Sequence, residues 1–262
     1  MRAAAAVLST AVVAVSACGS TETKPAGPPH VSGFSLQSKL LGRHLDQRLV
    51  TPAGGGKGRP LLVFLHGYGG SPSDTFDEAF ASSLQALGGQ APVVLLPEGE
   101  VGWWHDRAEG KWGSYVLREA IPAALERSGA DPDRVAIGGI SMGGFGALDL
   151  ARFGSFCAVG GHSPAVYERG SDEISFGFDD ARDFARHDLL TTARRRNPYG
   201  DVPVWIDVGK QDGLRPAAAK LAHELKADGA DVSFHVWPGG HDGQYWDAHF
   251  SQYLRFYNDA CS

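Results

Sequence analysis

The sequence lacks the patterns that mark several large functional classes. It contains no HExxH or CxxC metal-binding motif and no GxxxxGK[ST] phosphate-binding loop, which excludes the common zinc motifs and the Walker nucleotide site. The acidic run from Asp172 to Asp180 also lacks the ligand spacing of an EF-hand. We therefore predict neither a metal site nor a cofactor.

Positive charge is scarce as well. The formal net charge is −6 at pH 7, and the one basic run, Arg194–Arg196, is too short to bind a polyanion by itself. Proteins that bind nucleic acids carry basic patches that neutralise phosphates. The charge pattern therefore excludes nucleic acid as a partner.

The N-terminal apolar run is too short to cross a bilayer. Residues 3–15 form a run of about 13 residues, whereas a membrane-spanning helix needs about 20. With Arg2 before it, the run is typical of a signal peptide over residues 1–17. It ends in VSACG, which resembles the lipobox of bacterial lipoproteins. We predict that Cys18 carries lipid and anchors the protein outside the cytoplasm, on the outer face of the cell membrane. An ordinary secretory signal, which would release the protein, is the alternative.

Residues 18–32 are rich in Ser, Thr, Pro and Gly. Such a composition cannot form a core, and it predicts a flexible tether. The remainder, residues 33–262, is of a length that routinely folds as one α/β domain. The tether would therefore hold the catalytic domain at a distance from the membrane surface.

Cysteine is the next scarce residue, with only 3 in the chain. If Cys18 carries lipid, Cys157 and Cys261 remain, and an oxidising compartment permits a disulfide between them. A buried Cys157 thiol and a loose C-terminal Cys261 are the alternative. The sequence leaves both possibilities open.

Short apolar runs alternate with stretches that have helical character. Continuous apolar runs are expected of strands that are buried on both faces. They predict strands at 61–65, 93–96, 134–140, 156–161, 202–209 and 232–237, after one or two antiparallel strands within 34–50. Helices are expected near 74–87, over 113–127 with a kink at Pro122, over 215–228 and from 244 onward. This alternation predicts an α/β fold with a mostly parallel sheet covered by helices on both faces. The polar and aromatic segment 165–200 breaks the rhythm, and we expect it to lie over the functional site.

One motif carries clear chemistry. Gly139-Ile140-Ser141-Met142-Gly143 is a G-x-S-x-G sequence between a predicted strand and a predicted helix. A nucleophile on such a sharp turn needs very small flanking residues, because larger side chains would collide across the turn. The turn exposes the serine hydroxyl and places the Met142 N–H at a helix N-terminus, where it can stabilise an oxyanion. We predict that Ser141 is a nucleophile.

Three further positions complete a catalytic set. The turn His66-Gly67-Tyr68 follows a predicted strand, and we expect the Tyr68 N–H to be the second oxyanion donor. Asp212 follows the strand at 202–209 and is the expected acid, whereas Asp207, within that strand, is expected to satisfy loop amides. His241 lies in a Gly-rich loop after the last strand and is the expected base.

Together, the segments HGYGGS, GISMGGFGAL, VGKQD and PGGHDGQYW resemble the putative-esterase family of α/β-hydrolases. That family includes S-formylglutathione hydrolase (esterase D), tributyrin esterases, feruloyl esterases and mycobacterial mycolyltransferases. The resemblance covers about residues 40–258. It implies the α/β-hydrolase fold, a Ser141–His241–Asp212 triad, and an oxyanion hole made by Tyr68 and Met142.

The resemblance predicts a serine carboxylic-ester hydrolase that acts on a small-molecule or envelope ester through an acyl-enzyme. An envelope acyltransferase with the same triad is the near alternative, and a non-catalytic binding lipoprotein is a remote one. The aromatic segment Trp103–Asp106, together with Lys111 and Trp112, is expected to emerge at the catalytic edge of the sheet, where similar segments of the family lie. Packing of a long loop is the competing explanation for these tryptophans.

Overall fold

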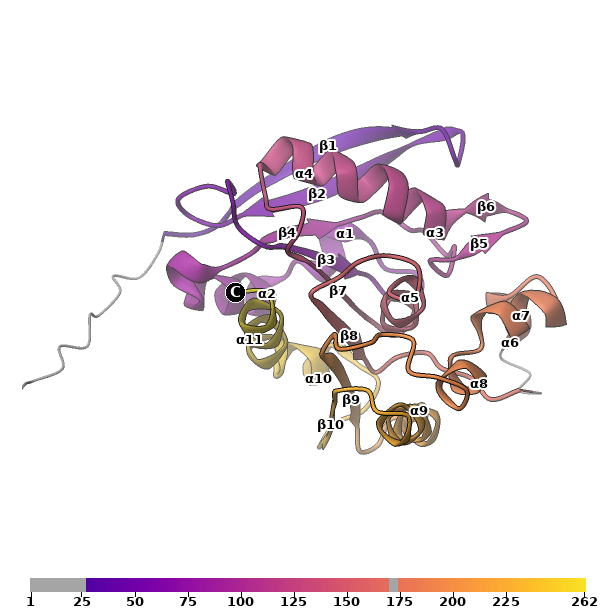
Figure 1. Ribbon diagram of the computed structural model, residues 1–262. Coiled ribbons are helices and arrows are strands. Elements are labelled where there is room, and N and C mark those ends of the chain that lie inside the picture. Colours follow the sequence, from indigo (N-terminus) through magenta and orange to yellow (C-terminus); the bar gives the residue numbers. More distant parts are fainter. Residues whose placement is uncertain (1–26, 170–173) are drawn as a thin grey trace, which may run out of the picture.

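The computed structural model describes residues 27–169 and 174–262. Its centre is a sheet of eight strands (Figure 1). In spatial order they are β1 (His30–Ser38), β2 (Arg43–Thr51), β4 (Val93–Leu96), β3 (Leu61–Leu65), β7 (Val135–Ile140), β8 (Ala158–His162), β9 (Val204–Gly209) and β10 (Val232–Trp237). Strand β2 runs antiparallel to β1 and β4, and the remaining pairs are parallel. The sheet is thus mostly parallel, as the alternating pattern predicts.

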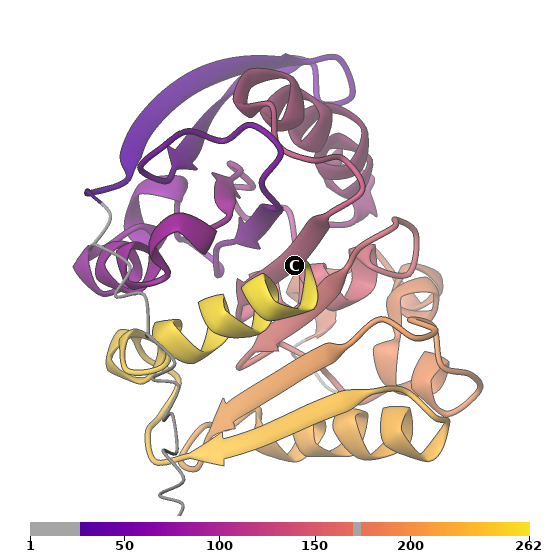
Figure 2. The ribbon, with the colours of Figure 1, turned by 60° about the vertical axis from the view of Figure 1, so that its left-hand side comes forward.

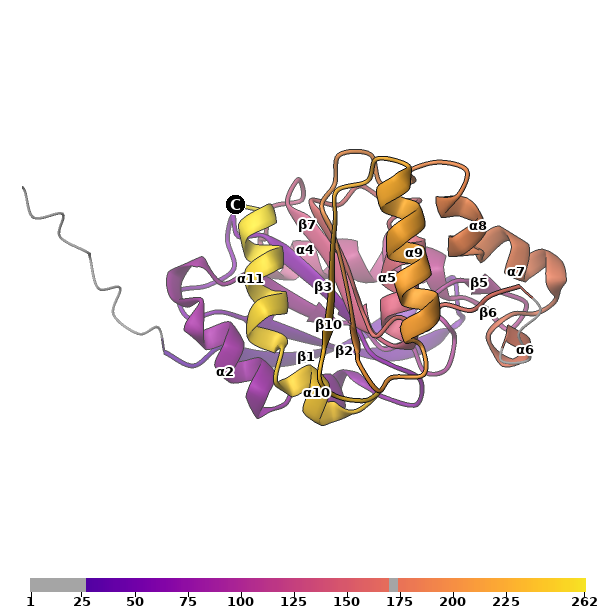
Figure 3. The ribbon, with the colours of Figure 1, turned by 90° about the horizontal axis from the view of Figure 1, so that it is seen from below.

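Helices cover both faces of this sheet. Helices α2 (Glu78–Ala86) and α11 (Phe250–Ala260) pack together on one face, and Figure 2 shows α11 crossing it. Helices α4 (Ile121–Ser128), α5 (Met142–Leu150) and α9 (Arg215–Ala227) cover the other face (Figure 3). Strand β3 shows why helices are needed on both faces, because its side chains alternate between the hydrophobic cores on the two sides of the sheet. One core contains Leu61, Val63 and Leu65, and the other contains Leu62 and Phe64. A strand buried on both faces is apolar at every position.

Two expected helices are interrupted. The helix expected at 74–87 is divided into α1 (Pro72–Thr75) and α2, because the Asp77 side chain accepts a hydrogen bond from the Phe80 N–H and starts a new helix. The helix expected at 113–127 consists of α3 (Trp112–Tyr115), a π-helical turn η2 (Val116–Ala120) and α4. Pro122 lies in the first turn of α4, directly after the π turn. A proline lacks the N–H that a continuous helix needs there.

The C-terminal elements are likewise divided. The helix expected from residue 244 consists of α10 (Gly243–Asp247) and α11. Short elements complete the chain: the 3₁₀ turn η1 (Gly88–Gln90), a ribbon of β5 (Asp106–Arg107) and β6 (Gly110–Lys111), and the helices α6 (Ile174–Gly177), α7 (Ala181–His187) and α8 (Leu189–Ala193).

The predicted signal peptide 1–17 and the lipid site Cys18 lie outside the described residues. The tether prediction for 18–32 is wrong at its end, because β1 begins at His30 and pairs with β2 from that residue onward. Among residues 27–169 and 174–262, no helix is both long and apolar enough to span a membrane.

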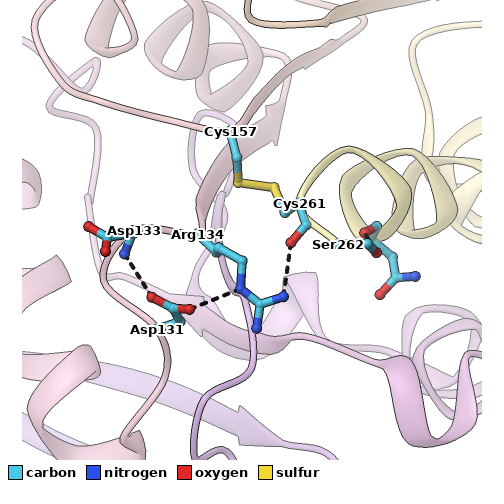
Figure 4. The surroundings of a disulfide bond; sticks show 7 residues. Asp131, Asp133, Arg134, Cys157, Cys261 and Ser262 are labelled. Atoms are coloured by element: carbon cyan, nitrogen blue, oxygen red, sulfur yellow. Dashed lines mark hydrogen bonds and ion pairs between the residues drawn. A yellow bond between two sulfur atoms is a disulfide. The ribbon is translucent and has the colours of Figure 1, made fainter.

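Cys157 and Cys261 form a disulfide, which decides between the two possibilities left open by the sequence (Figure 4). Cys157 immediately precedes β8, and Cys261 follows α11. The side chain of Arg134 donates a hydrogen bond to the Cys261 carbonyl at 3.2 Å and pairs with Asp131. The bond therefore attaches the C-terminus to the sheet across 104 residues of sequence.

Candidate active site

The turn at Ser141 connects the central strand β7 to α5. Ser141 has φ 57° and ψ −114°, a backbone conformation that side-chain-bearing residues rarely adopt. A Cβ added to Gly139 would lie 2.6 Å from the Leu65 carbonyl oxygen, and one added to Gly143 would lie 2.1 Å from the same atom. Both positions therefore admit only glycine, which is the steric reason that the G-x-S-x-G motif predicts a sharp turn.

The structure brings Ser141, His241 and Asp212 together. His241 lies in the loop between β10 and α10, and its Nε2 is 2.9 Å from the Ser141 Oγ. Its Nδ1 is 2.8 Å from the Asp212 Oδ2, at the loop between β9 and α9. The three residues come from loops at the carboxyl ends of β7, β9 and β10. They form a chain of hydrogen bonds from hydroxyl to imidazole to carboxyl.

The surroundings of Asp212 fix its charge. Burial raises the pKa of this carboxyl, but hydrogen bonds from His241 and from the Leu214 N–H outweigh burial, so that the pKa is lowered overall. Asp212 is therefore a carboxylate at neutral pH. It accepts the Nδ1 proton of His241, which leaves the Nε2 lone pair free to accept the Ser141 hydroxyl proton.

Two backbone segments border the serine. Met142 is the first residue of α5, so its N–H is one of the unpaired donors at that helix N-terminus. The turn at Gly67 approaches from β3, where an added Cβ would lie 3.5 Å from the Ser141 Cβ and the Ile140 carbonyl oxygen. Tyr68, the next residue, lines the same pocket as Ser141. Both predicted oxyanion residues thus adjoin the serine.

A pocket of about 490 Å³ opens at Ser141. Its apolar wall includes Trp246 and Phe250, and the ring of Trp246 packs edge-on against His241. Its polar wall includes Asp74, Asp77 and Asp247. Burial and the neighbouring Asp77 raise the pKa of Asp247 to about 6. The pocket therefore combines an aromatic side with an acidic side whose charge changes near neutral pH.

The segment of the tryptophans emerges at the catalytic edge as expected, because β4 runs parallel to β3 and β7, but the rings pack as the competing explanation has it. Trp103, Trp104 and Trp112 are buried, and none of them lines the Ser141 pocket. Trp104 instead donates a hydrogen bond from Nε1 to the His66 carbonyl at 3.1 Å and packs edge-on against the His66 ring. His66 in turn accepts the Gly99 N–H at its Nε2. These side chains support the turn at 66–68 from behind.

The segment 165–200 does not cover the site as expected. None of its described residues lines the pocket at Ser141. Phe176 of α6 packs edge-on against the exposed ring of Tyr68 and against Trp103. The segment therefore lies beside the Tyr68 turn, where the aromatic contacts attach it to the rim of the site.

Asp207 has partners other than the expected loop amides. Its Oδ1 accepts hydrogen bonds from His162 and from the indole of Trp205, and its Oδ2 accepts from the hydroxyls of Tyr245 and Tyr253. Tyr245 belongs to α10, which directly follows the His241 loop. The buried carboxylate thus fastens that helix to β9. An acidic residue inside an apolar strand was the only sequence signal for this cluster.

Comparisons with known proteins point to one family and one fold. The family model described as "Putative esterase" matches residues 38–257. An esterase of Mycobacterium tuberculosis is 32% identical over 157 residues, which cover 54% of this chain and 34% of that protein. The match thus spans about a third of the length of that curated relative.

Solved structures share the fold. A ferulic acid esterase superposes with a TM-score of 0.77 at 21% identity, covering 89% of this chain and 99% of that one. An S-formylglutathione hydrolase from Agrobacterium tumefaciens has a TM-score of 0.77 at 20% identity, covering 90% and 96% of the two chains. The fold is therefore that of the α/β-hydrolases, as the sequence predicts.

Proposed function

This chain belongs to the Putative esterase family and is by family a carboxylic ester hydrolase, and from that premise we propose that it cleaves esters through an acyl-enzyme on Ser141. The observation that carries the proposal is the hydrogen-bonded chain from Ser141 through His241 to Asp212, set at a strained strand-to-helix turn. A hydroxyl held on an imidazole that is itself held by a carboxylate is the arrangement that activates a serine.

In the first half-reaction, the Ser141 Oγ attacks the ester carbonyl carbon while its proton moves to the His241 Nε2. Asp212 stabilises the resulting imidazolium through the Nδ1 hydrogen bond. The carbonyl oxygen becomes an oxyanion and accepts hydrogen bonds from the N–H groups of Met142 and Tyr68. The tetrahedral intermediate then expels the alcohol, which takes the proton from His241, and the acyl group stays on Ser141.

In the second half-reaction, water takes the place of the alcohol. The His241 Nε2 accepts a proton from the water, whose oxygen attacks the acyl carbon, and the same two N–H groups again hold the oxyanion. Collapse of this intermediate returns the proton from His241 to the Ser141 Oγ and releases the carboxylic acid. The His241 side chain is about one-third exposed, so water can reach it once the alcohol has left.

The pocket also favours a class of substrate. Trp246 and Phe250 offer an apolar surface, whereas Asp74, Asp77 and Asp247 would repel an anion. A pocket of about 490 Å³ is within the range that holds a small molecule. We therefore expect uncharged esters with a short or aromatic group to be preferred over esters that carry a carboxylate.

The test is the loss of activity and of covalent labelling in Ser141→Ala. Purified Ser141→Ala should hydrolyse p-nitrophenyl acetate and butyrate at least 10⁴-fold more slowly than the wild type, as expected when a triad member is removed, and a fluorophosphonate probe should no longer label it. Ser233→Ala, which changes an exposed serine on β10, is the matched control and should behave as wild type. Unchanged hydrolysis by Ser141→Ala would refute the proposal.

Lipid attachment at Cys18 and an extracytoplasmic location stay predictions. Transfer of the acyl group to an envelope alcohol, instead of water, would use the same triad. Incubation with an acyl donor and trehalose, followed by a search for acylated sugar, distinguishes transfer from hydrolysis.

A further inference from the structure

A second cluster of ionisable side chains lies away from Ser141, between α5, α7 and the start of the β5–β6 ribbon. His105 precedes β5, and Asp183 and His187 lie four residues apart on α7. Figures 1 and 3 show α7 beside the ribbon. One ligand atom from each of the three side chains lies within 4.8 Å of the other two. From this convergence we infer that His105, Asp183 and His187 form a binding site for a divalent transition-metal ion, zinc in particular.

The hydrogen bonds assign the protons of both imidazoles. The His105 Nε2 is 3.0 Å from the Gly177 carbonyl oxygen, so this nitrogen must carry the proton. The His187 Nδ1 is 2.7 Å from the Asp149 Oδ2, so it carries the proton of that ring. The remaining nitrogens, Nδ1 of His105 and Nε2 of His187, therefore present lone pairs.

Both lone pairs face the same carboxylate. The Asp183 Oδ1 is 3.9 Å from the His105 Nδ1 and 3.8 Å from the His187 Nε2, too far for hydrogen bonds. His105 is only 1% exposed, and its Nδ1 has no hydrogen-bond partner among the described residues. A buried acceptor without a donor is costly. A cation between the three atoms would satisfy all of them at once.

The donor set and its surroundings favour zinc. Two imidazole nitrogens and one carboxylate oxygen are ligands that zinc accepts, and ligand distances of about 2.0–2.1 Å place neighbouring ligand atoms about 3.3 Å apart. The two nitrogen–oxygen separations, 3.9 and 3.8 Å, need a contraction of roughly half an ångström to reach this spacing. The Asp149 carboxylate and the Gly177 carbonyl hold the opposite nitrogens of the rings, as outer partners of zinc-bound histidines commonly do.

Charge at the cluster is compatible with a bound cation. Arg186 donates a hydrogen bond to the Asp183 Oδ1, but a carboxylate oxygen has a second lone pair and the Arg186 side chain is largely exposed. Arg152 pairs with the Asp149 Oδ1, whereas His187 contacts the Oδ2.

A route to solvent is also present. A cavity of about 540 Å³ is lined by His105, Asp149 and His187. It gives an ion a path into the cluster and room for a water molecule as fourth ligand. The ion would join α7 to the segment that carries Trp103, whose ring packs on Phe176 beside the Tyr68 turn. Its expected effect is to stabilise this side of the molecule.

The first experiment measures zinc binding to the full domain after treatment with a chelator and dialysis. Isothermal titration with ZnCl₂ should show one site per chain. His105→Ala and His187→Ala should each weaken binding by more than the 10–100-fold typical of losing an outer partner, whereas His223→Ala, an exposed histidine on α9, should not. Zinc at 100 times its Kd should raise the Tm of the wild type by about 5–10 °C.

The second experiment does not depend on variants. Crystals of the wild type soaked in ZnCl₂ should show an anomalous peak at the zinc edge between His105, Asp183 and His187. No binding by titration, equal binding by His187→Ala, or a peak only at other residues would overturn the proposal. In that case the hydrogen bond between His187 and Asp149 would be the structural role of the cluster.

Discussion

Gly143→Ala sets two physical effects against each other at the nucleophile turn. Gly143 is the second residue of α5, and alanine is favoured over glycine in helices by about 1 kcal/mol. Against this, the new Cβ would lie 2.1 Å from the Leu65 carbonyl oxygen, 2.5 Å from the Leu65 carbonyl carbon and 2.7 Å from the His66 carbonyl oxygen. These are backbone atoms of β3 and of the turn that follows it, and they cannot rotate away as a flexible side chain would.

Steric repulsion should therefore win. Overpacking of a tight interior typically costs about 1–3 kcal/mol, so Gly143→Ala should be destabilised even after the gain in helix propensity. At about 2–4 °C per kcal/mol for a domain of this size, the net fall in Tm should be a few degrees. Relief of the clash must move α5 away from β3, and a displacement of about 1 Å at a catalytic group can cost about 100-fold in rate.

Thermal unfolding followed by circular dichroism and kcat/KM for p-nitrophenyl butyrate measure the two effects. Gly89→Ala is the matched control, because a Cβ there meets no atom within 4 Å and Gly89 lies outside the site. It should retain its activity and Tm. A Gly143→Ala variant with a raised Tm and unchanged kcat/KM would show that helix propensity outweighs the clash, and the account of the turn would be wrong.

Three further predictions concern the acid, the pocket and the disulfide. Asp212→Asn should lower kcat/KM about 10⁴-fold, because the amide stabilises the wrong tautomer of His241, and a fall of less than tenfold in p-nitrophenyl ester hydrolysis would remove Asp212 from the triad. Since the pKa of Asp247 is raised to about 6, its carboxyl is neutral below and charged above that pH. The ratio of kcat/KM for an anionic ester to that for a neutral ester should therefore fall about fivefold as pH rises from 5 to 7. This ratio cancels any pH dependence that both esters share, and it should stay flat in Asp247→Asn if Asp247 is responsible. Replacing both Cys157 and Cys261 by serine should cost roughly 3–5 kcal/mol, because the bond closes a long loop; an unchanged urea midpoint would contradict this.

The sequence predicts those parts of the fold that depend on local chemistry. Continuous apolar runs identify the central strands, because a strand buried on both faces has no polar position. The elbow is predictable because only glycine fits at 139 and 143. Long-range packing is harder to predict. Trp103 and Trp104 follow β4 at the catalytic edge as expected, yet both rings are buried outside the Ser141 pocket. An aromatic residue in a loop is compatible with either orientation.

The cluster at His105 shows a second limit. Motif searches look for metal ligands that are close in sequence, but His105 is separated from α7 by more than one element of the fold. The spacing of Asp183 and His187, four residues apart on one helix face, was the available signal. It is weak alone, since many exposed helices carry such pairs. Only the folded chain shows the third ligand atom and the buried lone pair.

Asp207 and Asp212 show how position along one strand and the following loop separates two acids. Asp207 lies inside β9, fully buried, and four side-chain donors occupy its two oxygens. Asp212 lies beyond the strand end, where one oxygen accepts the Leu214 N–H and the other remains for His241. The proposed acid of the triad is thus the carboxylate that keeps one oxygen available to accept a hydrogen bond from His241. Asp207, whose two oxygens are both occupied, holds α10 in place through Tyr245. It thereby also positions the loop that carries His241. Both acids therefore act on the same imidazole, one by direct contact and the other through the backbone that places it.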